Sequence, residues 1–250
     1  MWSAGMTNPI RNISNNLNNP NGLFVTVDGD IYIDNGNNGH VDKWEVNAIN
    51  ATRIMDVASN CFSLFVDINN TLYCSLESQH QVVTLSLANN SGNVTMLVAG
   101  TGTPGSTSAM LDSPRGVFVN INFDLYIADC GNDRIQLYYA GHSFGTTIIG
   151  NGSSEIITLD CPSGIILDVD DHLFIVDTNN HRIIGPTLNG YRCIAGCSNS
   201  SGSASNQLNF PQSLAFDSFG NLFVVDRNNS RIQKFILENN FCGKYIIIVS

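Results

Sequence analysis

Residues 111–138, LDSPRGVFVNINFDLYIADCGNDRIQLY, decide the fold because four similar segments occur elsewhere in the chain. These segments begin their first apolar run at Gly22, Ser63, Gly164 and Ser213. The central aromatic residues of the five units are 41, 53, 48 and 49 residues apart and are Tyr32, Tyr73, Tyr126, Phe174 and Phe223. A period of this size is typical of repeated supersecondary units.

Each unit is predicted to contain short β-strands and no helix. Runs rich in Val, Ile, Phe and Tyr alternate with Asp/Asn/Gly turns, and no stretch has a 3.6-residue period. The first two runs of a unit are apolar at successive positions, as in 117–119 and 125–128, so both faces of the sheet should be covered. Linking segments such as 94–100, 146–150 and 191–196 supply a fourth strand. Four-stranded sheets stacked radially form a β-propeller.

The sequence therefore predicts an all-β propeller of four-stranded antiparallel blades over residues 20–250, preceded by an N-terminal segment, residues 1–19. The units at 114–136, 162–184 and 211–233 read Pro-x-Gly/Ser-apolar, Leu-aromatic-apolar-apolar-Asp and Asn-x-Arg-Ile, a pattern that resembles the NHL repeat. Unit 1 has Gly-His-Val instead of Asn-x-Arg-Ile, and unit 2 has Ser75 and Phe62 in place of Asp and Pro.

The resemblance implies a ring that usually has six blades, whereas five units are present. The ring is thus five-bladed, incomplete, or a six-bladed ring closed by a clasp. A strand within residues 9–14, paired with residues 244–249, is the predicted clasp.

The composition excludes two classes of partner. The chain has 21 acidic and 11 basic residues and a formal charge of −10, which would repel a phosphate backbone. No apolar run approaches the roughly 18 residues of a spanning helix. We therefore expect no nucleic acid partner and no membrane span.

Other features favour an extracellular protein. No secretory signal is visible, so we expect that the given chain lacks its leader. Acceptor motifs for N-glycosylation occur at Asn12, Asn50, Asn69, Asn89, Asn93, Asn151, Asn199 and Asn228. Seven cysteines add to this interpretation. With strands running up and down, Cys130 and Cys161 fall in loops on one face, which predicts a disulfide. Cys193 and Cys197 are expected to bridge locally or to pair elsewhere, and an odd count leaves one thiol over.

Repeated charged residues are predicted to be structural. Three units carry an Asp followed by Asn three residues later and Arg five residues later, so the carboxylate can cap the turn and pair with the Arg. The pairs are Asp129 and Arg134, Asp177 and Arg182, and Asp226 and Arg231. A single active site would not need three copies. Asp28, Asp67, Asp168 and Asp217 likewise recur in the turn after the first strand of a unit and are read as turn residues.

No catalytic, metal or cofactor site is predicted. The five histidines, His40, His80, His142, His172 and His181, form no close metal-type pair, although a propeller channel can gather ligands from distant blades. Gly100-x-Gly102-x-x-Gly105 matches a dinucleotide fingerprint only superficially, because no helix or βαβ unit follows it.

The favoured function is a non-enzymatic module that binds a protein or glycan through its loop faces. The alternative is a metal-dependent enzyme, since some NHL-like propellers resemble a zinc-dependent lyase of amidated-peptide precursors and other six-bladed rings are calcium or zinc hydrolases. RNA binding, known for NHL domains attached to zinc modules, is disfavoured by the acidic charge.

Overall fold

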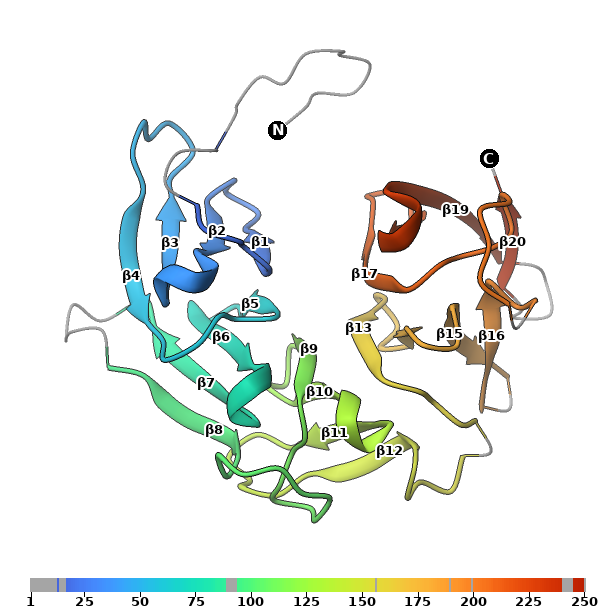
Figure 1. Cartoon of the computed structure of the whole chain (residues 1–250), viewed down its shortest axis with the longest axis horizontal. Coiled ribbons are helices and arrows are strands. Elements are labelled where there is room, and N and C mark those ends of the chain that lie inside the picture. The colour runs from blue at the N-terminus through green and yellow to red at the C-terminus, as the bar shows by residue number, and fades with distance from the viewer. Residues whose placement is uncertain are drawn as a thin grey trace.

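A computed structural model describes residues 13, 17–88, 94–155, 157–188, 190–198, 200–239 and 245–249, and shows a five-bladed β-propeller (Figure 1). Blade 1 contains β1 (Leu23–Val25), β2 (Ile31–Asp34), β3 (His40–Trp44) and β4 (Thr52–Asp56). Blade 2 contains β5 (Leu64–Val66), β6 (Thr71–Leu76), β7 (Gln81–Ser86) and β8 (Met96–Gly100). Blade 3 contains β9 (Pro114–Val119), β10 (Leu125–Asp129), β11 (Arg134–Tyr138) and β12 (Thr146–Gly150). Blade 4 contains β13 (Pro162–Leu167), β14 (Leu173–Asp177), β15 (Arg182–Thr187) and β16 (Gly190–Ala195). Blade 5 contains β17 (Pro211–Phe216), β18 (Leu222–Asp226), β19 (Arg231–Asn239) and β20 (Tyr245–Val249).

Every blade is an antiparallel meander of four consecutive strands, as predicted. In each sheet the first strand lies nearest the centre of the ring and the fourth lies at the outside (Figure 1). Between the second and third strands, four blades have a 3₁₀ turn: η1 (Gly36–Asn38), η2 (Glu77–Gln79), η3 (Cys130–Asn132) and η4 (Arg227–Asn229). The described part of the chain contains no α-helix, and so no helix that could cross a bilayer.

The hydrophobic core lies between neighbouring blades. One cluster joins Val41 and Met55 of blade 1 to Leu64 and Leu72 of blade 2, and similar clusters follow around the ring. This is why the strands are apolar on both faces: each sheet packs against a neighbour on either side. Burying one Leu or Ile side chain contributes roughly 1.5–3 kcal/mol.

Glycines let the innermost strands approach one another. A Cβ added to Gly116 of β9 would lie 2.4 Å from the carbonyl oxygen of Ser163 in the next blade, and one added to Gly164 would lie 3.1 Å from the Cα of Ser213. The Phe24, Phe65 and Phe118 rings line up along successive inner strands, with centroids 5.1 and 4.9 Å apart.

The five blades form an open arc. Blades 1 and 5 lie apart in Figure 1. Val225 and Ile232 are 38% and 69% exposed on blade 5. The end face of blade 1 is partly covered, because Ile13 and Leu17 pack against a buried cluster of Ile31, Ile33 and Trp44. Most of the predicted clasp strand lies outside the described residues, so it stays a prediction.

The topology gives the arc two distinct faces. All inner strands run in the same direction, so the turns between first and second strands open on one face. We call this the inner-turn face, defined by residues 26–30, 67–71, 120–124, 168–172 and 217–221. The turns between second and third strands, and the connections between blades, lie on the opposite face, which we call the clamp face.

Candidate functional site

Blades 3, 4 and 5 each carry a buried Asp paired with an Arg on the clamp face, and we call each of these pairs a clamp. In blade 3, Arg134 Nε donates to Asp129 Oδ2 at 2.7 Å, and Asn132 Nδ2 donates to the same oxygen at 2.8 Å. The other carboxylate oxygen of Asp129 accepts the backbone N–H of Asp112 at 2.7 Å. The pairs Asp177–Arg182 and Asp226–Arg231 have the same 2.7 Å contact.

Each Arg also holds the loop that enters its blade. Arg134 donates to the carbonyl oxygens of Ser106, Thr107 and Met110 at 2.8–3.1 Å. Arg231 makes three equivalent bonds in blade 5. In Arg134 and Arg231 all three guanidinium nitrogens therefore donate hydrogen bonds to protein oxygens, as expected of a residue that holds the fold together.

The carboxylates of the clamps are buried, so we do not consider them candidates for catalytic acids. Burial raises the pKa of Asp129 and Asp177, although the backbone N–H groups of the entry loops, the turn Asn side chains and the arginines oppose this. Both side chains are fully buried and fully bonded, so their oxygens cannot reach a ligand. The three Asp–Arg pairs expected from the sequence are present, and their purely structural role stays a prediction.

Blades 1 and 2 replace the clamp with different contacts. Asp34 has no Arg partner, and its oxygens accept the N–H groups of Cys61 and Asn21 at 3.0 and 3.3 Å. Ser75 takes the Asp position in blade 2 and donates to the carbonyl oxygen of Arg115, whose Nε contacts Glu77 at 2.8 Å. In blades 1 and 2, where the sequence departs from the repeat pattern, these other hydrogen bonds therefore take the place of the Asp–Arg pair.

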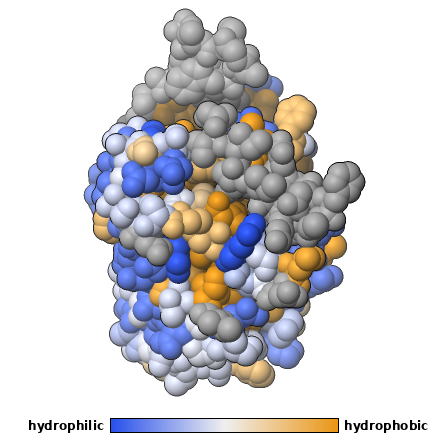
Figure 2. Space-filling view, turned by 90° about the vertical axis from the view of Figure 1, so that its right-hand side faces the viewer, coloured by the Kyte–Doolittle hydropathy of each residue, from blue (hydrophilic) through white to orange (hydrophobic). Residues whose placement is uncertain are grey.

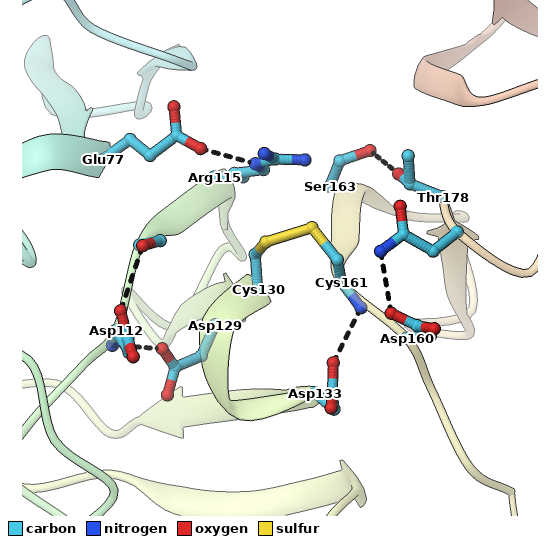
Figure 3. Close-up of a disulfide and its surroundings, with 12 residues drawn as sticks. Glu77, Asp112, Arg115, Asp129, Cys130, Asp133, Asp160, Cys161, Ser163 and Thr178 are labelled. Carbon is cyan, nitrogen blue, oxygen red and sulfur yellow. Dashed lines mark hydrogen bonds and ion pairs between the residues drawn. A yellow bond between two sulfur atoms is a disulfide. The ribbon is translucent and has the colours of Figure 1, made fainter.

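Three disulfides reinforce the clamp face: Cys61–Cys74, Cys130–Cys161 and Cys193–Cys197. The second is the pair expected from the strand topology, and it joins blade 3 to the start of blade 4 (Figure 3). The third is local. Sequence reasoning missed the first, which ties the entry loop of blade 2 to β6, and Cys242 lies outside the described residues. Three disulfides indicate an oxidising compartment.

A hydrogen bond between neighbouring blades also recurs beside the clamps, from a backbone N–H of one blade to a side chain of the blade before it. His80 Nδ1 accepts the N–H of Ser113 at 3.0 Å, and His181 Nδ1 accepts that of Phe210 at 3.1 Å. Asp133 does the same for Cys161 at 2.8 Å (Figure 3). All three acceptors have positive φ, and two histidines are thereby assigned to inter-blade contacts.

The remaining histidines stay apart from one another. His40 Nε2 lies 3.4 Å from Asp42, and His142 packs between the rings of Tyr139 and Phe144. His172 belongs to a group with Asp168 and Asp170 whose ligand atoms lie within 4.8 Å, the only such group in the described residues. This group lies in an exposed inner turn whose capping hydrogen bonds recur with other residues in the neighbouring blades.

Four of the predicted glycosylation acceptors are exposed. Asn50 and Asn69 lie in turns on the inner-turn face, while Asn151 and Asn228 lie on the clamp face. Asn12, Asn89, Asn93 and Asn199 fall outside the described residues.

One cavity of about 300 Å³ lies between blades 4 and 5, lined by Ile194, Ala195, Cys197 and Phe235 among others. Figure 2 shows the side of the ring that carries blades 4 and 5, with hydrophobic residues gathered between polar flanks. None of the lining side chains is ionisable, since Cys197 is in a disulfide. The described lining therefore offers no titratable acid or base, and its polar side chains are Ser198 and Asn206.

The NHL repeat family model matches residues 159–185 and 208–235, the cores of blades 4 and 5. No curated protein matches the sequence. Among solved structures, a streptogramin B lyase is 16% identical with a TM-score of 0.67, covering 95% of this chain and 71% of that one. A catalytically inactive virginiamycin B lyase from Staphylococcus aureus with quinupristin is 13% identical with a TM-score of 0.61, covering 95% and 86%. A chain of a nidogen/laminin complex is 16% identical with a TM-score of 0.66, covering 86% and 74%.

These identities establish a shared fold and no shared activity. Together with the repeat match and the five sheets, they show that this chain is a five-bladed β-propeller containing NHL repeats.

Proposed function

We propose that this chain is a non-enzymatic, extracellular binding module that engages a protein or glycan through its loop faces. The observation that carries the proposal is that the repeated charged residues are bonded to one another and to the entry loops within the fold. Each clamp Asp and Arg is bonded to the turn and the entry loop of its own blade, so its charge serves assembly. Binding is the activity that such a ring performs without a catalytic constellation.

Two further features support the extracellular part of the proposal. Three disulfides suit an oxidising compartment. The exposed acceptors Asn50, Asn69, Asn151 and Asn228 are open to glycosylation. The similar chain in the nidogen/laminin complex comes from an assembly of two proteins, which is consistent with a binding role for this fold.

The test is capture of a partner by the immobilised, disulfide-bonded chain from extracellular fluid, followed by reconstitution with the purified partner. A saturable complex is the expected result. Failure of any protein or glycan to bind saturably would refute the proposal.

A metal-dependent enzyme is the second candidate, because lyase structures cover 95% of the chain. Metal analysis of the purified protein separates the two. A stoichiometric zinc or calcium removed only by a chelator favours the enzyme, and a chelator-insensitive, metal-free protein favours the binding module.

A further inference from the structure

The inner-turn face carries one exposed aliphatic side chain at the same turn position in four blades. Ile68 and Ile121 are 70% and 71% exposed, and Val27 and Val169 are fully exposed. Blade 5 has Ser218 at this position, followed by Phe219, which is 88% exposed. We call Val27, Ile68, Ile121, Val169 and Phe219 the tip residues.

Four of the five turns that carry the tip residues are capped by the side chain of their first residue. Asp67 Oδ1 accepts the N–H groups of Asn69 and Thr71 at 2.9 and 2.8 Å. Asn120, Asp168 and Asp217 make the same pair of bonds in their own turns. This side-chain cap fixes the turn whatever the tip residue is, and a polar tip would cost the fold nothing.

Exposed apolar side chains are concentrated on this face. The outer turns add Ile49, Phe144 and Leu188, which are 89%, 55% and 71% exposed. In the described loops of the clamp face, Phe210 at 37% is the one large hydrophobic residue that is well exposed, while Leu23, Val225 and Ile232 lie within strands. Single exposed apolar residues need no explanation, but a set on one face marks an interaction surface.

Neighbouring inner strands bring the tip residues toward the centre of the ring. β5 contacts β9, β9 contacts β13 and β13 contacts β17, so the turns that follow them lie side by side along the inner side of the arc (Figure 1). A partner centred on the ring axis would meet several tip residues together.

The charge of the inner turns defines the chemistry of that partner. The five turns contain eight Asp residues and no Lys or Arg. Lys43 and Lys234 reach in from adjacent strands, 2.8 Å from Asp30 and 3.7 Å from Asp217, and leave most of the carboxylates unneutralised. An anionic lipid surface or a second copy with a charge of −10 would be repelled.

We propose that the inner-turn face binds a polypeptide whose apolar side chains are flanked by Lys and Arg. The proposal rests on the binding function proposed above and names its face and its ligand chemistry. The tip residues supply apolar burial, and the surrounding carboxylates select a basic partner.

The experiment uses the full disulfide-bonded chain and two labelled model peptides, one amphipathic peptide of Leu and Lys and one of Leu and Glu. The test variant is Ile68→Ser/Ile121→Ser/Val169→Ser, and the matched control is Phe210→Ser on the clamp face. Fluorescence anisotropy measures binding at low and high salt, and the melting temperature of each variant checks folding.

We expect the Leu/Lys peptide to bind the wild type and the control, with affinity falling as salt rises. The triple variant should bind at least tenfold more weakly at an unchanged melting temperature, because its three side chains lie outside the core. Equal binding of the Leu/Glu peptide, no loss in the triple variant, or no binding of the Leu/Lys peptide would each overturn the proposal.

The same variants separate this proposal from the proposed function. A captured partner that the triple variant retains and Phe210→Ser loses would refute the inner-turn site while leaving the binding function intact. If neither the wild type nor any variant captures a partner, the binding function itself fails.

Discussion

Removing the arginine from a clamp should destabilise the propeller in proportion to how deeply the clamp is buried. The arginine side chains of Arg134, Arg182 and Arg231 are 7%, 18% and 30% exposed, while all three partner carboxylates are fully buried. Replacing Arg by Met keeps an unbranched apolar stem and removes the charged guanidinium. The variant then leaves a buried Asp without its counter-ion and, for both Arg134 and Arg231, three carbonyl oxygens without their donor.

Breaking a buried pair by removing one partner costs about 3–5 kcal/mol, and we assign this range to Arg134→Met. For Arg231→Met the expected loss is roughly 1–2 kcal/mol, because water reaches the partly exposed site and screens the remaining charge. In a domain of this size 1 kcal/mol lowers the melting temperature by about 2–4 °C. The expected decreases are therefore roughly 6–20 °C for Arg134→Met and roughly 2–8 °C for Arg231→Met, with Arg182→Met between them.

Calorimetry or circular dichroism under non-reducing conditions measures the three decreases side by side. Keeping the disulfides oxidised matters, because Cys130 directly follows Asp129 in the chain. An Arg231→Met variant that loses as much stability as Arg134→Met, or an Arg134→Met variant that loses none, would refute the reasoning that burial sets the strength of the clamps.

Three further predictions follow from the blade contacts. Cys130→Ser/Cys161→Ser opens a closed loop with a sequence separation of 31 residues and should cost about 3–4 kcal/mol in denaturant unfolding; an unchanged midpoint would contradict this. Gly116→Ala should cost roughly 1–3 kcal/mol because its Cβ would meet the Ser163 carbonyl oxygen, and a stabilised variant would show that the inner strands are not in close contact. Burial raises the pKa of Asp34, so the folded chain binds this proton at a higher pH than the unfolded chain, and the stability contributed by Asp34 increases as pH falls through the folded pKa. Melting curves from neutral pH to pH about 4 should therefore show Asp34→Asn gaining less stability on acidification than the wild type, whereas a constant difference between the two would count against a raised pKa.

Most of the fold was predictable because it repeats. The aromatic positions from Tyr32 to Phe223 fixed the number of units, and the apolar character of both strand faces required a stacked arrangement. The same comparison showed that Asp129 and Arg134 form a structural pair, and strand direction alone brought Cys130 and Cys161 to one face.

Other features could not be read from one sequence. Val27, Ile68, Ile121 and Val169 extend the apolar runs of the first strands by two positions, so they look like core residues. Only the turn geometry reveals them as tips, because the Asp or Asn before them in three of these turns bends the chain out of the sheet. The Cys61–Cys74 disulfide was also hidden, since blade 2 is the most divergent unit and offers no comparison for the entry loop.

The contiguity of each blade has a consequence for how the molecule comes apart. Every described strand of a sheet comes from one uninterrupted stretch of chain, so blade 5 can detach by breaking its contacts with blade 4, such as the Phe210–His181 hydrogen bond, while the strand pairing within blades 1 to 4 stays intact. We therefore expect unfolding to begin at blade 5 and to stop at the Cys130–Cys161 disulfide, which joins blades 3 and 4. Limited proteolysis should accordingly release the last blade first and leave a shorter arc that is still folded.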